Sequence, residues 1–151
     1  MWVRIRAGIG HSVSTDGGRT WSTVAPSTIP HVRSRFFIRR LDSGNLLLVR
    51  HDPADGNFAT SEGKGTRSHL KAYLSEDDGE TWIGGLLLDE RKHISYPDGQ
   101  QAEDGKIYVT YDRARTKERE VLLVVFAEDD IRAVELPAFP VAPLRITVSR
   151  P

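Results

Sequence analysis

The sequence reads Ser14-Thr15-Asp16-Gly17-Gly18-Arg19-Thr20-Trp21 near its start and Ser75-Glu76-Asp77-Asp78-Gly79-Glu80-Thr81-Trp82 near its middle. Both stretches follow the pattern S-x-D-x-G-x-T-W, and they begin 61 residues apart. A match at five fixed positions arises by chance in about one window in 10⁶ of average composition. The two copies therefore indicate a repeated structural unit.

The residue types in this pattern are typical of a hairpin turn. An Asp side chain at the start of a turn accepts backbone N–H groups two residues on, and Gly adopts the positive φ that other residues resist. Thr then begins a strand, and the Trp ring packs against a neighbouring sheet. Catalysis by Asp16 and Asp77 is the less favoured alternative, because one copy per unit suits architecture. We expect structural roles for Ser14, Asp16, Gly18, Thr20, Trp21, Ser75, Asp77, Gly79, Thr81 and Trp82.

Outward from the repeat, apolar residues fall into short runs separated by turn signals such as Asp42-Ser43-Gly44-Asn45 and Asp104-Gly105. This spacing predicts an all-β sandwich, barrel or propeller. One helical turn is predicted at Glu128 to Val134, where acidic residues would complement a helix N-terminus. Alternation predicts half-buried strands at 68–75 and 106–113, and continuous apolar runs predict buried strands at 36–38, 46–49 and 121–126.

Composition excludes several classes of protein. Lys plus Arg and Asp plus Glu total 21 each, so the formal charge is zero, which argues against a nucleic-acid partner. The longest apolar run, Val121 to Ala127, is far shorter than the roughly 20 residues that span a bilayer. Neither the absence of cysteine nor the N-terminus, which shows no signal peptide, settles the localisation.

The repeat resembles the Asp box, or BNR repeat, of the sialidase (neuraminidase) superfamily. This resemblance implies a six-bladed β-propeller of four-stranded blades, with Asp boxes between the third and fourth strands. The chain would then form a partial propeller of about two and a half blades. We expect residues 1–32 to end one blade, 33–92 to form a complete blade, and 93–151 to form the last blade and a C-terminal tail.

The sequences SYPDG at 95–99 and DGKIYVTYD at 104–112 resemble segments of bacterial sialidase-like proteins. The resemblance implies that Tyr96 is the nucleophile. A neutral phenol avoids the repulsion that a carboxylate nucleophile would meet at a sugar bearing its own carboxylate, although a pKa near 10 requires an activating partner. The alternative is that Tyr96 only packs at the turn before Pro97.

The family binds the sialic acid carboxylate with three arginines. Thr66-Arg67-Ser68-His69-Leu70 resembles the segment that supplies the third arginine, so Arg67 is a candidate substrate-binding residue. Met1-Trp2-Val3-Arg4 resembles the strand that ends in the second, which makes Arg4 a candidate, with Arg6 as its alternative if the register differs by two. An ordinary surface role is the competing interpretation for each.

The family's first arginine, its acid/base Asp and its activating Glu match no position here and would lie upstream of Met1. We therefore expect a C-terminal portion of an exo-α-sialidase-like glycoside hydrolase, with little or no activity of its own. Its partner would be a sialylated glycan or related acidic sugar. One alternative is a non-catalytic Asp-box propeller for glycan binding or protein interaction. Another is a half propeller that self-associates through exposed blade edges.

The five histidines, at positions 11, 31, 51, 69 and 93, show none of the common metal-ligand spacings, so we expect neither a metal nor a cofactor. Relatives that act on host glycans are often exported, but the localisation of this chain stays open.

Overall fold

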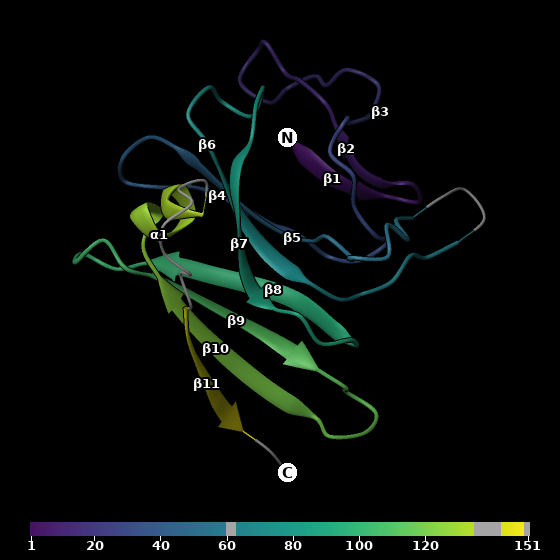
Figure 1. Cartoon of the computed structure of the whole chain (residues 1–151). Coiled ribbons are helices and arrows are strands. Elements are labelled where there is room, and N and C mark those ends of the chain that lie inside the picture. Colours follow the sequence, from purple (N-terminus) through teal and green to yellow (C-terminus); the bar gives the residue numbers. More distant parts are fainter. Residues whose placement is uncertain (60–62, 135–142, 150–151) are drawn as a thin grey trace.

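Antiparallel strands account for nearly all regular structure in the computed structural model, which describes residues 1–59, 63–134 and 143–149. They form three sheets, here called sheets 1, 2 and 3 (Figure 1). Sheet 1 contains β1 (Trp2–Ile5), β2 (Gly8–His11) and β3 (Ala25–Pro26). Sheet 2 contains β4 (Phe37–Arg40), β5 (Leu46–His51), β6 (Leu70–Ser75) and β7 (Ile83–Asp89). Sheet 3 contains β8 (Ile94–Gln101), β9 (Ile107–Arg113), β10 (Glu120–Phe126) and β11 (Leu144–Ser149).

Each sheet is a meander in which strands pair in chain order. The all-β prediction is confirmed, and the predicted helical turn is α1 (Glu128–Ala133). Its first turn carries three acidic residues, and Asp130 accepts the Ala127 N–H at 2.7 Å. No helix in the described parts of the chain is long and apolar enough to cross a membrane. The number of propeller blades stays a prediction.

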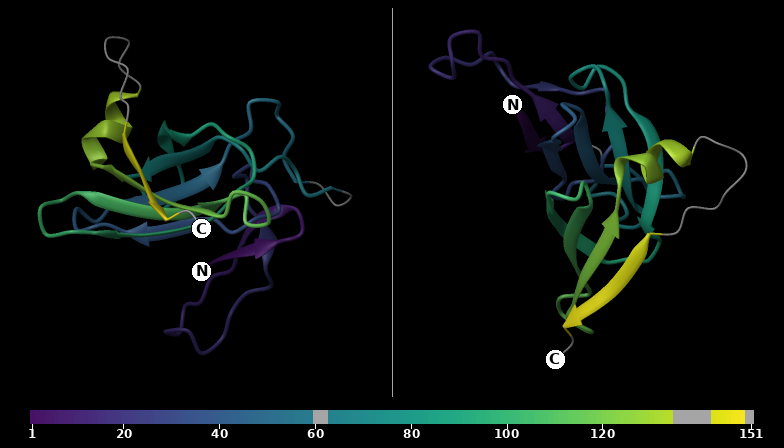
Figure 2. Two further views of the ribbon diagram at one scale, coloured as in Figure 1. Left: turned by 90° about the horizontal axis from the view of Figure 1, so that it is seen from below. Right: turned by 90° about the vertical axis from the view of Figure 1, so that its left-hand side faces the viewer.

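A single apolar core joins sheets 2 and 3, which lie next to each other in both panels of Figure 2. Alternate residues of β6 and β9 point into it, as their sequence periodicity predicts. Its buried members are Leu41, Leu47, Val49, Leu70, Ala72, Leu74, Leu86 and Leu88 from sheet 2, Ile94, Ile107, Val109, Tyr111, Leu122, Val124 and Phe126 from sheet 3, and Ile131 from α1. Among the described residues, none from β1, β2 or β3 belongs to this core.

Two predictions of burial are wrong. Residues 36–38 are only half-buried, because β4 is an edge strand and all three side chains line a hollow. Trp21 of the first repeat is 47% exposed and donates its indole N–H to the Gly18 carbonyl, so it packs on its own turn and not on a neighbouring sheet. By contrast, the half-buried Trp82 lies beside Trp2 of β1 at Gly79.

Both repeats form the predicted clamp between the last two strands of a sheet. In the second copy, Asp77 Oδ1 accepts the Thr81 N–H at 2.9 Å and Asp77 Oδ2 accepts the Thr81 hydroxyl at 2.5 Å. The Ser75 hydroxyl donates to Asp77 and accepts the Gly79 N–H, both at 2.8 Å. Gly79 has φ +98°, as the turn requires. Asp77 thus accepts N–H groups four residues on rather than two.

The first copy has the same geometry. Asp16 accepts the Thr20 N–H and hydroxyl at 2.9 and 2.7 Å, and Ser14 donates to Asp16 at 2.8 Å. These hydrogen bonds lower the pKa of Asp16 and of Asp77 to about 2, led by the threonine hydroxyl in each case. Every carboxylate oxygen of the pair is therefore engaged in holding a turn, which supports the structural interpretation.

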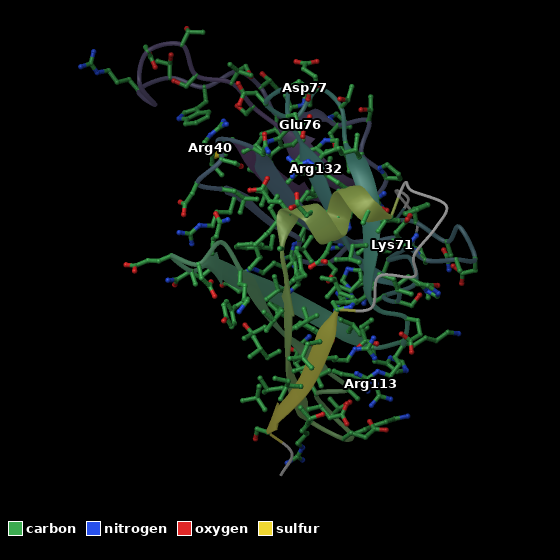
Figure 3. All side chains as sticks on the ribbon, turned by 60° about the vertical axis from the view of Figure 1, so that its left-hand side comes forward. Arg40, Lys71, Glu76, Asp77, Arg113 and Arg132 are labelled. Atoms are coloured by element: carbon green, nitrogen blue, oxygen red, sulfur yellow. The ribbon has the colours of Figure 1, made fainter. Side chains whose placement is uncertain are left out.

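A buried ionic network adds to the apolar contact between sheets 2 and 3. Asp89 at the end of β7 is fully buried, and it accepts hydrogen bonds from Arg91 at 2.6 Å and from the Tyr111 hydroxyl of β9 at 3.0 Å. Arg91 also donates to Glu120 of β10 at 3.3 Å. On the outer side, Arg132 of α1 pairs with Glu76 at 2.8 Å, as Figure 3 shows.

Helix α1 packs closely against a glycine of β7. Gly84 in β7 has φ +90°, and a Cβ at this position would lie 2.8 Å from the Ile131 carbonyl oxygen and even closer to the Ile131 side chain. Gly105 has a similar φ of +81°, but a Cβ there would meet no atom within 4 Å. The two glycines therefore differ in packing and not in backbone conformation.

We predict that Gly84→Ala lowers the free energy of unfolding by about 3 kcal/mol, because overpacking adds to the backbone penalty. Gly105→Ala is the matched control and should cost only about 1 kcal/mol, from backbone strain alone. Urea unfolding followed by circular dichroism measures both. Equal losses in the two variants would contradict close packing of α1 on β7.

Candidate functional site

Tyr96 lies at a β-bulge. In the pairing of β8 with β9, Ser95 faces Asp112 and Asp98 faces Thr110, so Tyr96 and Pro97 together oppose Tyr111. Proline has no N–H for the ladder and is tolerated at bulges, and bulges re-aim side chains. Tyr96 has φ +54°, which is uncommon for a residue with a side chain, and it is 42% exposed between buried neighbours. The bulge thus turns the phenol out of the sheet.

A hollow of about 490 Å³, here called the tyrosine hollow, opens where β1, β4 and β8 converge. Arg4 enters it from β1 and Tyr96 enters it from β8. Arg35 and Asp98 also line it and pair with each other at 2.9 Å. Trp2, Phe36, Phe37 and Ile38 supply its apolar wall.

Two guanidinium groups surround the phenol. The Cζ atom of Arg115 lies 4.4 Å from the centroid of the Tyr96 ring, within cation–π range. Arg115, with a smaller contribution from Arg4, lowers the pKa of Tyr96. Positive charge favours the phenolate over the phenol, so this environment raises the fraction of phenolate at any given pH.

Arg67 lies on the other side of the bulge. Its guanidinium donates to the Ser95 hydroxyl at 3.1 Å and to the Arg33 carbonyl at 3.0 Å. It lines a second hollow, of about 440 Å³, that Ser95 and Arg115 also line. The structure therefore brings Arg4 and Tyr96 together in one hollow and places Arg67 in the adjoining one.

Asp112 of β9 contacts Arg115, the residue whose guanidinium lies over Tyr96. Its Oδ2 atom pairs with the Nε of Arg115 at 3.1 Å, while its buried Oδ1 has no hydrogen-bond partner among the described residues. Burial raises the pKa of Asp112, and Arg115 and Arg67 oppose that rise. Asp112 thus anchors the guanidinium of Arg115 that lies over the Tyr96 ring.

Sequence reasoning missed Arg115 and Arg35. Arg115 belongs to the β9–β10 connection, where charged residues are usually solvated, and only the hairpin geometry brings it to Tyr96. Arg35 directly precedes the apolar run 36–38, a position where a charged residue usually serves only solubility. For Arg115 the available signal is the motif DGKIYVTYD, which ends three residues before it, and Arg35 has no comparable signal. Arg6, the alternative to Arg4, does not line the tyrosine hollow.

Comparison with known proteins yields one match. The family model described as BNR repeat-like domain matches residues 1–109, which is more than two thirds of the chain. No curated protein and no solved structure matches significantly. The parts of the chain that the structure describes contain no cluster of three or more His, Asp or Glu side chains suited to a metal ion.

We predict that Arg115→Gln raises the pKa of Tyr96, because the nearest positive charge is removed. A chain labelled with ¹³C at tyrosine Cζ reports the titration by NMR, and Tyr96→Phe assigns the signal. Burial raises the pKa of Tyr73 and of Tyr111, so those two signals titrate later. The control Arg19→Gln, in the first Asp box, should leave the Tyr96 titration unchanged. An unaltered pKa in Arg115→Gln would refute the electrostatic role.

Proposed function

The chain belongs to the BNR repeat-like domain family, and from this premise we propose that it is part of a sialidase-like glycoside hydrolase. Its three sheets would then be blades of a six-bladed propeller. The proposal rests on one observation, that Arg4 and Tyr96 line the same hollow although they are far apart in the sequence. The substrate would be a terminal acidic sugar of the sialic acid type.

In this proposal Arg4 binds the sugar carboxylate. A guanidinium forms two parallel hydrogen bonds with a carboxylate, which fixes both position and orientation. Arg35 contributes less, because Asp98 already occupies it. Arg67 would approach the same sugar only from the adjoining hollow, past Ser95.

Tyr96 would attack the anomeric carbon. A bond forms between the phenol oxygen and that carbon while the bond from the carbon to the leaving oxygen breaks, and the leaving oxygen must receive a proton. The phenol proton passes to solvent water, and Arg115 and Arg4 favour its loss by lowering the pKa of Tyr96. Water then cleaves the covalent intermediate with retention of configuration. No described residue of this chain is assigned to protonate the leaving oxygen.

Glycan binding without catalysis is the second candidate. The neighbours of Tyr96 favour this candidate. The charged groups that affect the pKa of Tyr96 are the guanidiniums of Arg115 and Arg4, whereas catalysis would call for a carboxylate base beside the phenol. A hollow lined by two arginines, four aromatic side chains, Ile38 and Asp98, with Asp98 paired to Arg35, would hold an acidic sugar without cleaving it.

Binding of N-acetylneuraminic acid tests the carboxylate contact. We expect Arg4→Gln to weaken binding about tenfold or more, because a charge-assisted hydrogen bond is lost. The methyl ester of the sugar should bind the unaltered chain as weakly as the free acid binds the Arg4→Gln variant. The Arg4→Gln substitution should then have little further effect on binding of the ester. Arg19→Gln is the control, and NMR titration supplies the dissociation constants. A free acid that binds Arg4→Gln as tightly as the unaltered chain would refute the assignment.

A sialyl fluoride with a second fluorine beside the anomeric carbon distinguishes the two candidates. Fluoride leaves without protonation, so attack by Tyr96 needs no acid, and the second fluorine slows hydrolysis of the adduct. We expect one sugar per chain by intact mass, with peptide mapping placing it on Tyr96. Tyr96→Phe should bind the sugar yet form no adduct. Binding without any adduct in the unaltered chain would favour the non-catalytic candidate.

A further inference from the structure

The second hollow differs in charge from the rest of the surface. Lys64, Arg67, Lys92, Arg115 and Lys117 line it, together with His93, and no described acidic residue does. Elsewhere seven of the described arginines pair with acids, and Arg40 with Asp78 and Arg132 with Glu76 are examples. We call this site the cationic hollow.

The positive charge in the cationic hollow is mostly uncompensated. Lys92 and Lys117 form no ion pair with any described carboxylate, and Arg67 donates only to the neutral oxygens of Ser95 and Arg33. Among the described carboxylates, Asp112 pairs directly with Arg115 and interacts electrostatically with Arg67. Like charges this close repel one another, so a bound anion would relieve the repulsion.

The hollow is also preformed. Three connections meet there, those leading into β6, β8 and β10, and backbone hydrogen bonds join them. The His93 N–H donates to the Arg67 carbonyl at 3.0 Å, and the Ala114 N–H donates to the His93 carbonyl at 3.0 Å. His93 and Ala114 have φ of +68° and +51°, conformations that persist because the surroundings impose them. Binding would therefore require little ordering of the backbone.

We propose that the cationic hollow binds a second anionic group, a carboxylate or a sulfate, on the sugar next to the terminal acidic sugar. This inference rests on the proposed function for the position of the terminal sugar. Arg115 connects the two hollows, since it lines the cationic hollow and stacks on Tyr96. A hollow of about 440 Å³ is of the size that holds a small ligand. The preferred substrate is thus a polyanionic glycan.

Three glycans test this specificity by calorimetry at low salt, namely 3′-sialyllactose, its derivative sulfated on galactose, and an α2,8-linked sialic acid trimer. The unaltered chain should bind at least one of the two polyanions about tenfold more tightly than 3′-sialyllactose. The sulfated and trimeric probes show which anion is preferred. Equal affinity for all three would overturn the proposal.

Lys92→Gln/Lys117→Gln should reduce that preference to less than about threefold while leaving 3′-sialyllactose binding unchanged. Both lysines are exposed, so the fold should persist. Lys106→Gln is the control, because Lys106 pairs with Asp104 on another hairpin. An equal loss in Lys106→Gln would overturn the proposal as unspecific attraction. If Arg4→Gln has no effect while the lysine variant does, the cationic hollow stands and the terminal-sugar assignment fails.

Discussion

The apolar contact between sheets 2 and 3 is the constraint on which the positions of the other elements depend. Leucines of β5, β6 and β7 face the alternating residues of β9 and β10 with almost no exposed surface. Asp89 lies at the end of this contact, where a buried carboxylate is tolerated only because Arg91 and Tyr111 donate to it. β7 ends at Asp89 and Ile94 is already buried in the core, so the connection between β7 and β8 is short. This short connection restricts where the bulge at Tyr96 can lie.

The two Asp boxes and the period of two in β6 and β9 made the all-β architecture predictable, because both signals arise within a few residues of the chain. The same holds for α1, whose acidic first turn is visible in the sequence. The run 36–38 was misjudged since composition shows that a strand is apolar but not which side of it meets another element. Trp21 differs from Trp82 for the same reason, as only the second has a neighbouring sheet to contact.

The candidate site was predictable in its residues and not in its arrangement. Motif resemblance singled out Arg4, Arg67 and Tyr96, but their distribution over two hollows follows from the bulge and from which face of β8 each neighbour meets. The contact between Arg115 and Tyr96 joins residues that are 19 positions apart in the sequence. It forms only because the connection between β9 and β10 lies close to β8. A formal charge of zero likewise conceals the local excess of cations, because acids and bases are balanced over the chain and segregated in space.

None of the described residues of sheet 1 belongs to the apolar core, and Trp2 of this sheet lies against the Asp-box turn at Gly79. Regions with few buried apolar contacts open at lower free energy than the molecule as a whole. Arg4 belongs to this region, whereas Tyr96 belongs to the stable one. A ligand bound by both Arg4 and Tyr96 would therefore link the β1–β2 hairpin to the more stable sheets 2 and 3. Amide exchange in β1 and β2 would then slow as the ligand occupies the tyrosine hollow.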